Sequence, residues 1–277
     1  MKKIICLILT VIMAISFTGC TVIDDVVSSL SNEVRFENSV SSSEIQNVID
    51  DMNDTDDICK SAAQQSQNGA MHTYDIAKII AEGFDVNEIS SIETRKNNNY
   101  SSSQSAVQAQ VNYAYRTLEL LLATADKLDK NGDYSSELEN IEDLYYDRDD
   151  DCKSAPQQVV NAYYRTLETL EVIAKIVDDD NNYSMEIEDI MDTYISMDNS
   201  SKSAPQQAVN GSYRCVDMIL LICEIVDYDD EFTSNIYSVS STLSSVDDSC
   251  KSAAQQEANG VYRMTEALCV LANIFNS

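Results

Sequence analysis

The sequence predicts an all-α protein built from five tandem copies of one helical hairpin. A Ser-Ala pair recurs five times with spacings of 44, 49, 49 and 49 residues, at Ser61, Ser105, Ser154, Ser203 and Ser252. A period of this length is typical of helical-repeat arrays. Hydrophobic residues make up 44% of the chain, enough for a core, whereas 6 glycines and 2 prolines in 277 residues are few for a strand-rich fold.

Each recurring serine is predicted to begin a long helix. A glutamine follows three residues later in every copy, at Gln64, Gln108, Gln157, Gln206 and Gln255. Ser-x-x-Gln is a capping box, in which the two side chains satisfy free backbone N–H groups at a helix start. In the third copy apolar residues then recur every three or four positions from Val160 to Val177, a helical apolar stripe. Long helices are therefore expected to start near residues 61, 105, 154, 203 and 252.

A shorter helix is predicted before each long one. Apolar residues stand sixteen and thirteen positions before each serine, as Leu138 and Ile141 do in the third copy. Neither helix can bury its stripe alone, so the hairpins must stack, either as an α-solenoid or as a closed helical-repeat bundle. The nearly constant period favours the solenoid. The shorter first period is attributed to the loop after the first long helix, with helix lengths unchanged.

The first twenty residues have the features of an export signal. Lys2 and Lys3 precede an apolar run over residues 4–15, which is too short to span a bilayer and matches a signal-peptide core. The run ends in Phe17-Thr18-Gly19-Cys20. This segment resembles the lipobox of bacterial lipoproteins, with Phe17 in place of the usual leucine. The resemblance implies cleavage after Gly19 and attachment of acyl chains to Cys20, a stable membrane anchor when there are two or three chains.

These features divide the chain into three parts. Residues 1–19 are predicted to be the lipoprotein signal peptide. Residues 20–43 form a lipid-anchored tether, with an extra helix over residues 22–34 as an alternative. Residues 44–277 form a single helical-repeat domain on the extracytoplasmic face of the cell membrane.

The net charge of -29 restricts the partners. A field of this sign repels nucleic-acid phosphates and anionic headgroups, so nucleic-acid binding is not expected. Basic peptides, basic protein surfaces and cations remain compatible.

A polar stripe recurs on the long helices. Asparagine, arginine or histidine, and an acid stand seven, eleven and fourteen residues after each serine, and tyrosine stands at position ten in four copies. The candidate binding residues are Tyr115, Arg116, Tyr164, Arg165, Tyr213, Arg214, Tyr262 and Arg263. The alternatives are a solvated face with Arg–Glu pairs three residues apart, or a polar ladder between adjacent repeats. The recurring asparagine favours the ladder.

Acidic loops follow the second, third and fourth long helices. Oxygen side chains stand at alternate positions in these loops, as hard cations need. The first loop, which begins at Asp129, resembles the start of a calcium loop of the EF-hand or dockerin kind. The weak candidate ligands are Asp129, Asn131, Asp133, Asp178, Asp180 and Asn182. Tyr134 replaces the turn glycine and Asn140 the closing acid, so a solvated acidic turn is favoured and no metal site is predicted.

Nucleophilic and histidine chemistry has little support in the sequence. His72 is the only histidine and occupies an arginine position of the repeat, so no Ser-His-Asp or Cys-His set is available. The six cysteines of the repeat domain are interpreted as small, mostly buried thiols, with disulfides as the alternative: Cys59, Cys152, Cys215, Cys223, Cys250 and Cys269. Neither an enzyme nor a cofactor is predicted.

The preferred function is a non-catalytic module that binds or scaffolds a protein or peptide, plausibly a basic one. A Ca²⁺-responsive structural envelope lipoprotein is the second hypothesis. A carboxylate-dependent cell-wall hydrolase is the third, and it would need two acids that converge in a cleft.

Overall fold

The computed structural model describes residues 34–100, 103 and 105–277, of which Arg35–Ser277 form one compact unit. Short and long helices alternate along it, and the described residues contain no strand. The predicted all-α fold of five hairpins is confirmed. The short helices are α3 (Ser42–Asp56), α5 (Ile89–Tyr100), α7 (Ser135–Asp151), α9 (Ser184–Ser200) and α11 (Thr233–Asp247). The long helices are α4 (Ala62–Gly83), α6 (Ala106–Leu128), α8 (Ala155–Val177), α10 (Ala204–Val226) and α12 (Ala253–Phe275).

The recurring serine is the N-cap residue of every long helix. The hydroxyl of Ser61 accepts the N–H of Gln64 at 3.3 Å, while the Gln64 side chain accepts the N–H of Lys60 at 2.7 Å. Ser154 and Ser203, which precede Ala-Pro, make no such hydroxyl cap. There the glutamine half of the box remains, as in the 2.9 Å bond from the N–H of Lys153 to Gln157.

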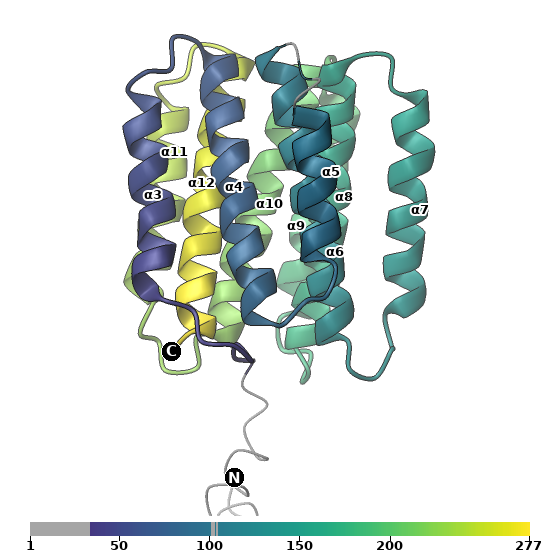
Figure 1. The fold of residues 1–277 in the computed structure, drawn as a ribbon, viewed down its shortest axis with the longest axis vertical. Coiled ribbons are helices and arrows are strands. Elements are labelled where there is room, and N and C mark those ends of the chain that lie inside the picture. Colours follow the sequence, from purple (N-terminus) through teal and green to yellow (C-terminus); the bar gives the residue numbers. More distant parts are fainter. Residues whose placement is uncertain (1–33, 101–102, 104) are drawn as a thin grey trace, which may run out of the picture. The chain divides into compact units, whose positions relative to one another are not determined.

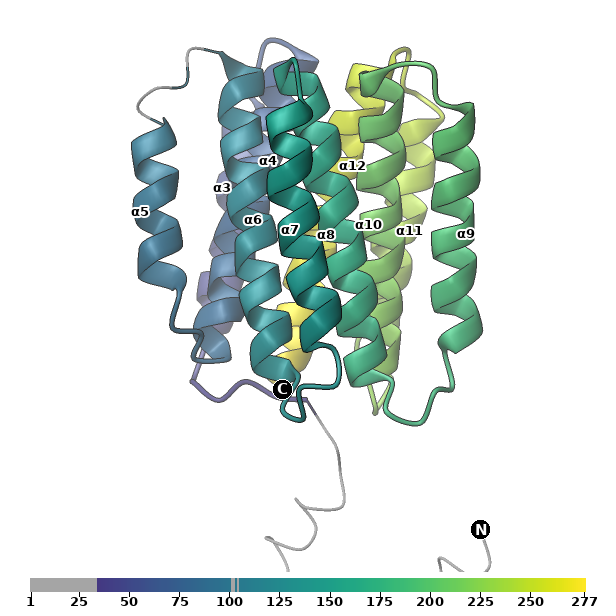
Figure 2. The same cartoon turned by 90° about the vertical axis from the view of Figure 1, so that its right-hand side faces the viewer.

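The five long helices form a closed ring. Each packs against the next in the order α4, α6, α8, α10, α12, and α12 packs back against α4 (Figure 1). The short helices lie outside the ring, each against the long helix of its own hairpin (Figure 2). The favoured open solenoid is therefore wrong, and the closed helical-repeat bundle is the observed form. An open array would leave an apolar face of the first and last long helices in water, and closure buries both.

The interior of the ring is filled by side chains. Leu118, Leu167, Leu170, Ile219 and Leu268 from four of the long helices are fully buried. An internal cavity of about 10 Å³ remains, with walls that include Thr73, Thr117 and Thr166, and it has room for about one water molecule. The ring at this level is a packed core rather than a channel.

An N-terminal strap of residues 35–41 joins the ends of the first and last long helices. The Phe36 N–H donates to the carbonyl of Phe275 at 3.0 Å, and the N–H of Glu37 donates to that of Gly83 at 2.8 Å. The Phe36 ring packs against Phe84 and Phe275, with centroids 5.1 and 5.7 Å apart. The described end of the expected tether thus belongs to the folded unit. The lipobox and the alternative helix over 22–34 lie outside the described residues, apart from residue 34.

The short first period was predicted to shorten one loop only, which is wrong. The loop over residues 84–88 is one residue shorter than the equivalent loop over 129–134. The remaining four residues lie at helix ends, since α4 ends one residue earlier in the repeat than α6, and α5 begins sixteen residues before its repeat serine against nineteen for α7. Asp85, at φ 56°, makes the left-handed turn that ends α4, and α5 then begins later in the repeat.

Candidate functional site

The four tyrosines of the polar stripe lie between neighbouring hairpins. The Tyr115 hydroxyl donates to Asp149 of the next hairpin at 2.5 Å and accepts from the Asn161 amide at 3.4 Å. Tyr262 closes the ring in the same way, by donating to Asp56 at 2.7 Å and accepting from Asn68 at 3.0 Å. The equivalent pairs are Tyr164 with Asp198 and Tyr213 with Asp247.

The recurring asparagine also ties each short helix to its own long helix. The side-chain amide donates to a backbone carbonyl sixteen residues earlier, at 2.9–3.1 Å, in all five hairpins. These bonds are Asn68 to Met52, Asn112 to Lys96, Asn161 to Tyr145, Asn210 to Tyr194 and Asn259 to Leu243. A side-chain amide has two donor hydrogens, so one residue can serve both its own hairpin and the next. This geometry is that of the inter-repeat ladder.

The joint between the first and second hairpins is built differently. Met71 occupies the tyrosine position of the ladder and Tyr100 the aspartate position. Here Lys96 lies over the ring of Tyr74, 4.6 Å from its centroid, and Tyr74 packs 6.2 Å from the ring of Tyr113. Apolar and cation–π contacts replace the ladder at this joint.

Replacing Tyr262 by phenylalanine is expected to lower the free energy of unfolding by about 1 kcal/mol, because a hydroxyl bonded to Asp56 and Asn68 is lost. Tyr237→Phe is the control, since Tyr237 is 74% exposed and its substitution should have little effect. Urea denaturation measures both. Equal values for the two variants would show that the ring-closing bond contributes nothing.

The stripe arginines are held by acids of their own helices. Arg116 pairs with Glu119 at 2.9 Å, and its side chain is 6% exposed. The same three-residue spacing joins Arg165 to Glu168, Arg214 to Asp217 and Arg263 to Glu266 at 2.7–3.0 Å. Since Tyr115 and Arg116 are each 5% exposed, the stripe offers a ligand little surface in the second hairpin.

In the acidic loops, the first aspartate accepts backbone N–H groups of the residues directly before the next short helix. The Asp129 carboxylate accepts the N–H groups of Asp133 and Tyr134 at 3.0 and 2.9 Å. Asp178 accepts those of Asn182 and Tyr183 at 3.0 Å each. An anion at a helix N-terminus is electrostatically favourable.

The other candidate ligands of these loops interact within their own loop or lie beside its turn. Asn131 precedes Gly132, whose φ of 71° makes the turn, and Asp180 is hydrogen-bonded to the Asn182 side chain. In the described part of the chain, no three acid, histidine or cysteine side chains converge as metal ligands.

The surroundings of the cysteines and of the histidine are those of residues that contribute to packing. All six described cysteines are free, and Cys215, Cys223 and Cys269 are buried. Burial raises the pKa of these three thiols well above its usual range, so they are poor nucleophiles. His72 is buried, with Nδ1 2.8 Å from the carbonyl oxygen of Asn68.

Two hollows lie on the outside of the ring. Each runs between consecutive short helices, with a long helix as its floor. The α5–α7 groove over α6 has a volume of about 470 Å³, and the α9–α11 groove over α10 about 560 Å³. They occupy equivalent positions of the repeat, and two hairpins are needed to form each one.

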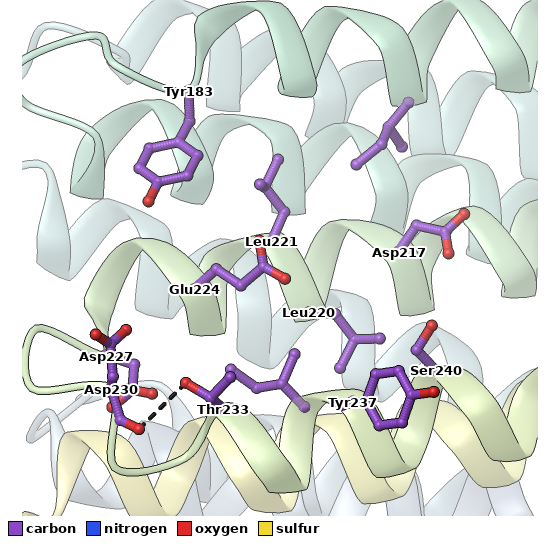
Figure 3. Close-up of a pocket in the computed structure, with 12 residues that line it drawn as sticks. Tyr183, Asp217, Leu220, Leu221, Glu224, Asp227, Asp230, Thr233, Tyr237 and Ser240 are labelled. Atoms are coloured by element: carbon purple, nitrogen blue, oxygen red, sulfur yellow. Dashed lines mark hydrogen bonds between the residues drawn. The ribbon is translucent and has the colours of Figure 1, made fainter.

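The α9–α11 groove combines apolar and acidic groups (Figure 3). Leu220 and Leu221 of α10 form its apolar floor. Figure 3 shows Tyr183 of the α9 side and Tyr237 of α11 on opposite sides of the groove, with Glu224 between them. Its acids are Asp217, Glu224, Asp227 and Asp230.

The acids of this groove differ in whether a cation or a backbone N–H group interacts with the carboxylate. Asp217 pairs with Arg214 at 3.0 Å, and Asp227 accepts the N–H of Phe232 at 2.9 Å. Glu224 forms no ion pair within the described residues, and burial and the charge of Glu186 raise its pKa. Glu224 thus lies in the groove, exposed to solvent, without a cation partner among the described residues.

Sequence reasoning missed this groove because its walls come from different hairpins. One signal in the sequence could have indicated that the grooves differ between hairpins. It is the position twenty-one residues after each repeat serine, where charge and residue type vary. It holds Glu82, Asp126, Lys175, Glu224 and Asn273.

The comparisons with known proteins returned no match to a family model, to a curated protein or to a solved structure. None of the helices in the described part of the chain is long and apolar enough to cross a membrane.

Proposed function

We propose that this protein is a lipoprotein anchored through Cys20 to the extracytoplasmic face of the cell membrane, and that it is a non-catalytic binding module for a basic protein or peptide. The α9–α11 groove is the proposed site. The supporting observation is that this groove joins an apolar floor to an acid, Glu224, without an internal cation. The net charge of -29 would also attract a basic partner over distance.

Other parts of the outer surface contain cations of their own. Lys175 on α8 lies 3.1 Å from Glu137 and 2.8 Å from Glu171. Arg95 in the α5–α7 groove lies 2.8 Å from Glu119. These pairs reduce the attraction for an external cation, so the α9–α11 groove is the preferred site for a basic ligand.

A defined peptide tests the proposal. A blocked decapeptide of alternating lysine and alanine, carrying a photo-crosslinker at its centre, is mixed with soluble protein that starts at Thr21. Crosslinks are expected within residues 183–240. The same peptide with acetylated lysines should bind at least tenfold more weakly, because each acetylation removes a positive charge.

Crosslinks spread evenly over the five hairpins would contradict the proposal, since they would indicate diffuse attraction to an acidic surface. Equal binding of the acetylated peptide would contradict the proposal as well, because binding would then not depend on the positive charge of the lysines.

A further inference from the structure

We infer that the interior of the ring contains a binding site for one water molecule, held by the Thr117 hydroxyl between the long helices α4, α6 and α8. The site is the internal cavity of about 10 Å³ whose walls include Thr73, Thr117 and Thr166. Because the cavity lies inside the ring, the inference is independent of the outer grooves and of the partner proposed for them.

A buried hydroxyl in the cavity wall needs a partner. Thr117 is 3% exposed, and its hydroxyl oxygen forms no hydrogen bond with any described residue. A buried polar group without a partner lowers stability by the full cost of its desolvation. Two other buried threonines avoid this cost within their own helices, since Thr124 donates to the Leu120 carbonyl and Thr169 to the Arg165 carbonyl, each at 2.8 Å. The Thr117 hydroxyl is therefore available to a ligand in the cavity.

Two further threonines bring hydroxyl groups to the same cavity. Thr166 of α8 lines it and is 2% exposed. Thr73 of α4 also lines it, and its hydroxyl lies 2.9 Å from both the Thr265 hydroxyl and the Gly69 carbonyl. A hydroxyl has one donor and two acceptor sites, so Thr73 can accept one more hydrogen bond. A buried water usually makes about three hydrogen bonds, and the three threonines can provide that number.

The size and chemistry of the cavity identify the ligand as water. A volume of about 10 Å³ accommodates one water molecule and nothing larger. A wholly apolar cavity would stay empty, and the threonines make this one polar. An ion would have no charged partner, because the other walls are Ala70, Ala114, Tyr163, Val261 and Met264. A bare charge in such surroundings is far more costly than a neutral water molecule.

The water has a structural role at the joint between the first and second hairpins. That joint lacks the tyrosine–aspartate bond of the ladder, because Met71 and Tyr100 occupy the two positions. A water bound to the three threonines connects α4 with α6 across this joint and also reaches α8. It thereby supplies, in the interior of the ring, a polar link that the other joints have in the ladder.

Crystallography of Thr117 variants tests the inference directly. Wild-type crystals that diffract to high resolution are expected to show one ordered solvent peak within hydrogen-bond distance of the Thr117 hydroxyl. The variant T117V has nearly the same shape without the hydroxyl, so its crystals should lack the peak. T117S keeps the hydroxyl and should keep the peak. Absence of the peak from wild type would overturn the inference, and so would a peak of equal height in T117V.

Urea denaturation of the same variant gives a second test in solution. When a water satisfies the Thr117 hydroxyl, T117V loses a bridging interaction, so its midpoint is expected to fall below that of wild type. When the hydroxyl has no partner, valine removes an unsatisfied group and the midpoint does not fall. T124V is the control, and its midpoint should fall because it loses the 2.8 Å bond to Leu120. A T117V midpoint equal to or above that of wild type, together with a fall in T124V, would overturn the inference.

Discussion

Replacing Gly69 by leucine is expected to lower the free energy of unfolding by about 3 kcal/mol, at the upper end of the usual cost of overpacking. Gly69 lies where α4 meets α12, the contact that closes the ring. A β-carbon at this position would lie 2.6 Å from the Tyr262 ring and 2.9 Å from the Val261 side chain. A leucine must therefore separate the two helices or displace Tyr262 from its bond to Asp56.

Urea denaturation of Gly69→Leu and of Ala254→Leu measures this effect. Ala254 lies in the first turn of α12 and is exposed, so its substitution is expected to change the free energy by less than about 0.5 kcal/mol. Small-angle scattering at low denaturant would show whether the Gly69 variant opens into an extended array. A Gly69 variant as stable and compact as wild type would contradict the importance of close packing at the closing joint.

Stability is expected to decrease as the pH rises towards 8, with Glu257 as one identified cause. Its carboxylate accepts the Gln110 amide at 2.7 Å across the ring, and that amide also donates to the Tyr163 hydroxyl at 3.0 Å. Burial raises the pKa of Glu257 to about 7. The folded state therefore holds this proton more tightly than the unfolded chain does, so the stabilisation is complete below pH 4 and is lost as the pH rises through 7.

Glu257→Gln is expected to stabilise the protein at pH 8 by about 2 kcal/mol. This is less than the free energy that corresponds to the whole rise in the Glu257 pKa, because the side chain is only partly buried. At pH 4, where the glutamate is protonated, the two proteins should unfold at similar urea concentrations. Glu231→Gln, at an exposed loop position, is the control. Burial also raises the pKa of Glu168 to about 7, so part of the pH dependence should remain in the variant. If the free energy of unfolding of Glu257→Gln fell with rising pH as steeply as that of wild type, the assignment would be contradicted.

Local patterns in the sequence predicted most of the hairpin. The Ser-x-x-Gln boxes located the starts of the long helices to within one residue, because capping depends on a few neighbouring groups. The recurring asparagine indicated an inter-repeat ladder, since a solvated face places no such demand on one residue type. The extent of α5 was not predicted, because the missing residues of the first period were assigned to a loop and not to helix ends.

The sequence by itself determined the five hairpins, their caps and their apolar faces, since each depends on residues close together in the chain. Only the tertiary structure decided that the array closes and where its grooves lie. Closure depends on small rotations between neighbouring hairpins that sum to a full turn, and these are set by contacts such as Gly69 with Tyr262. The α9–α11 groove likewise depends on the packing of α9, α10 and α11, because no single helix contains it.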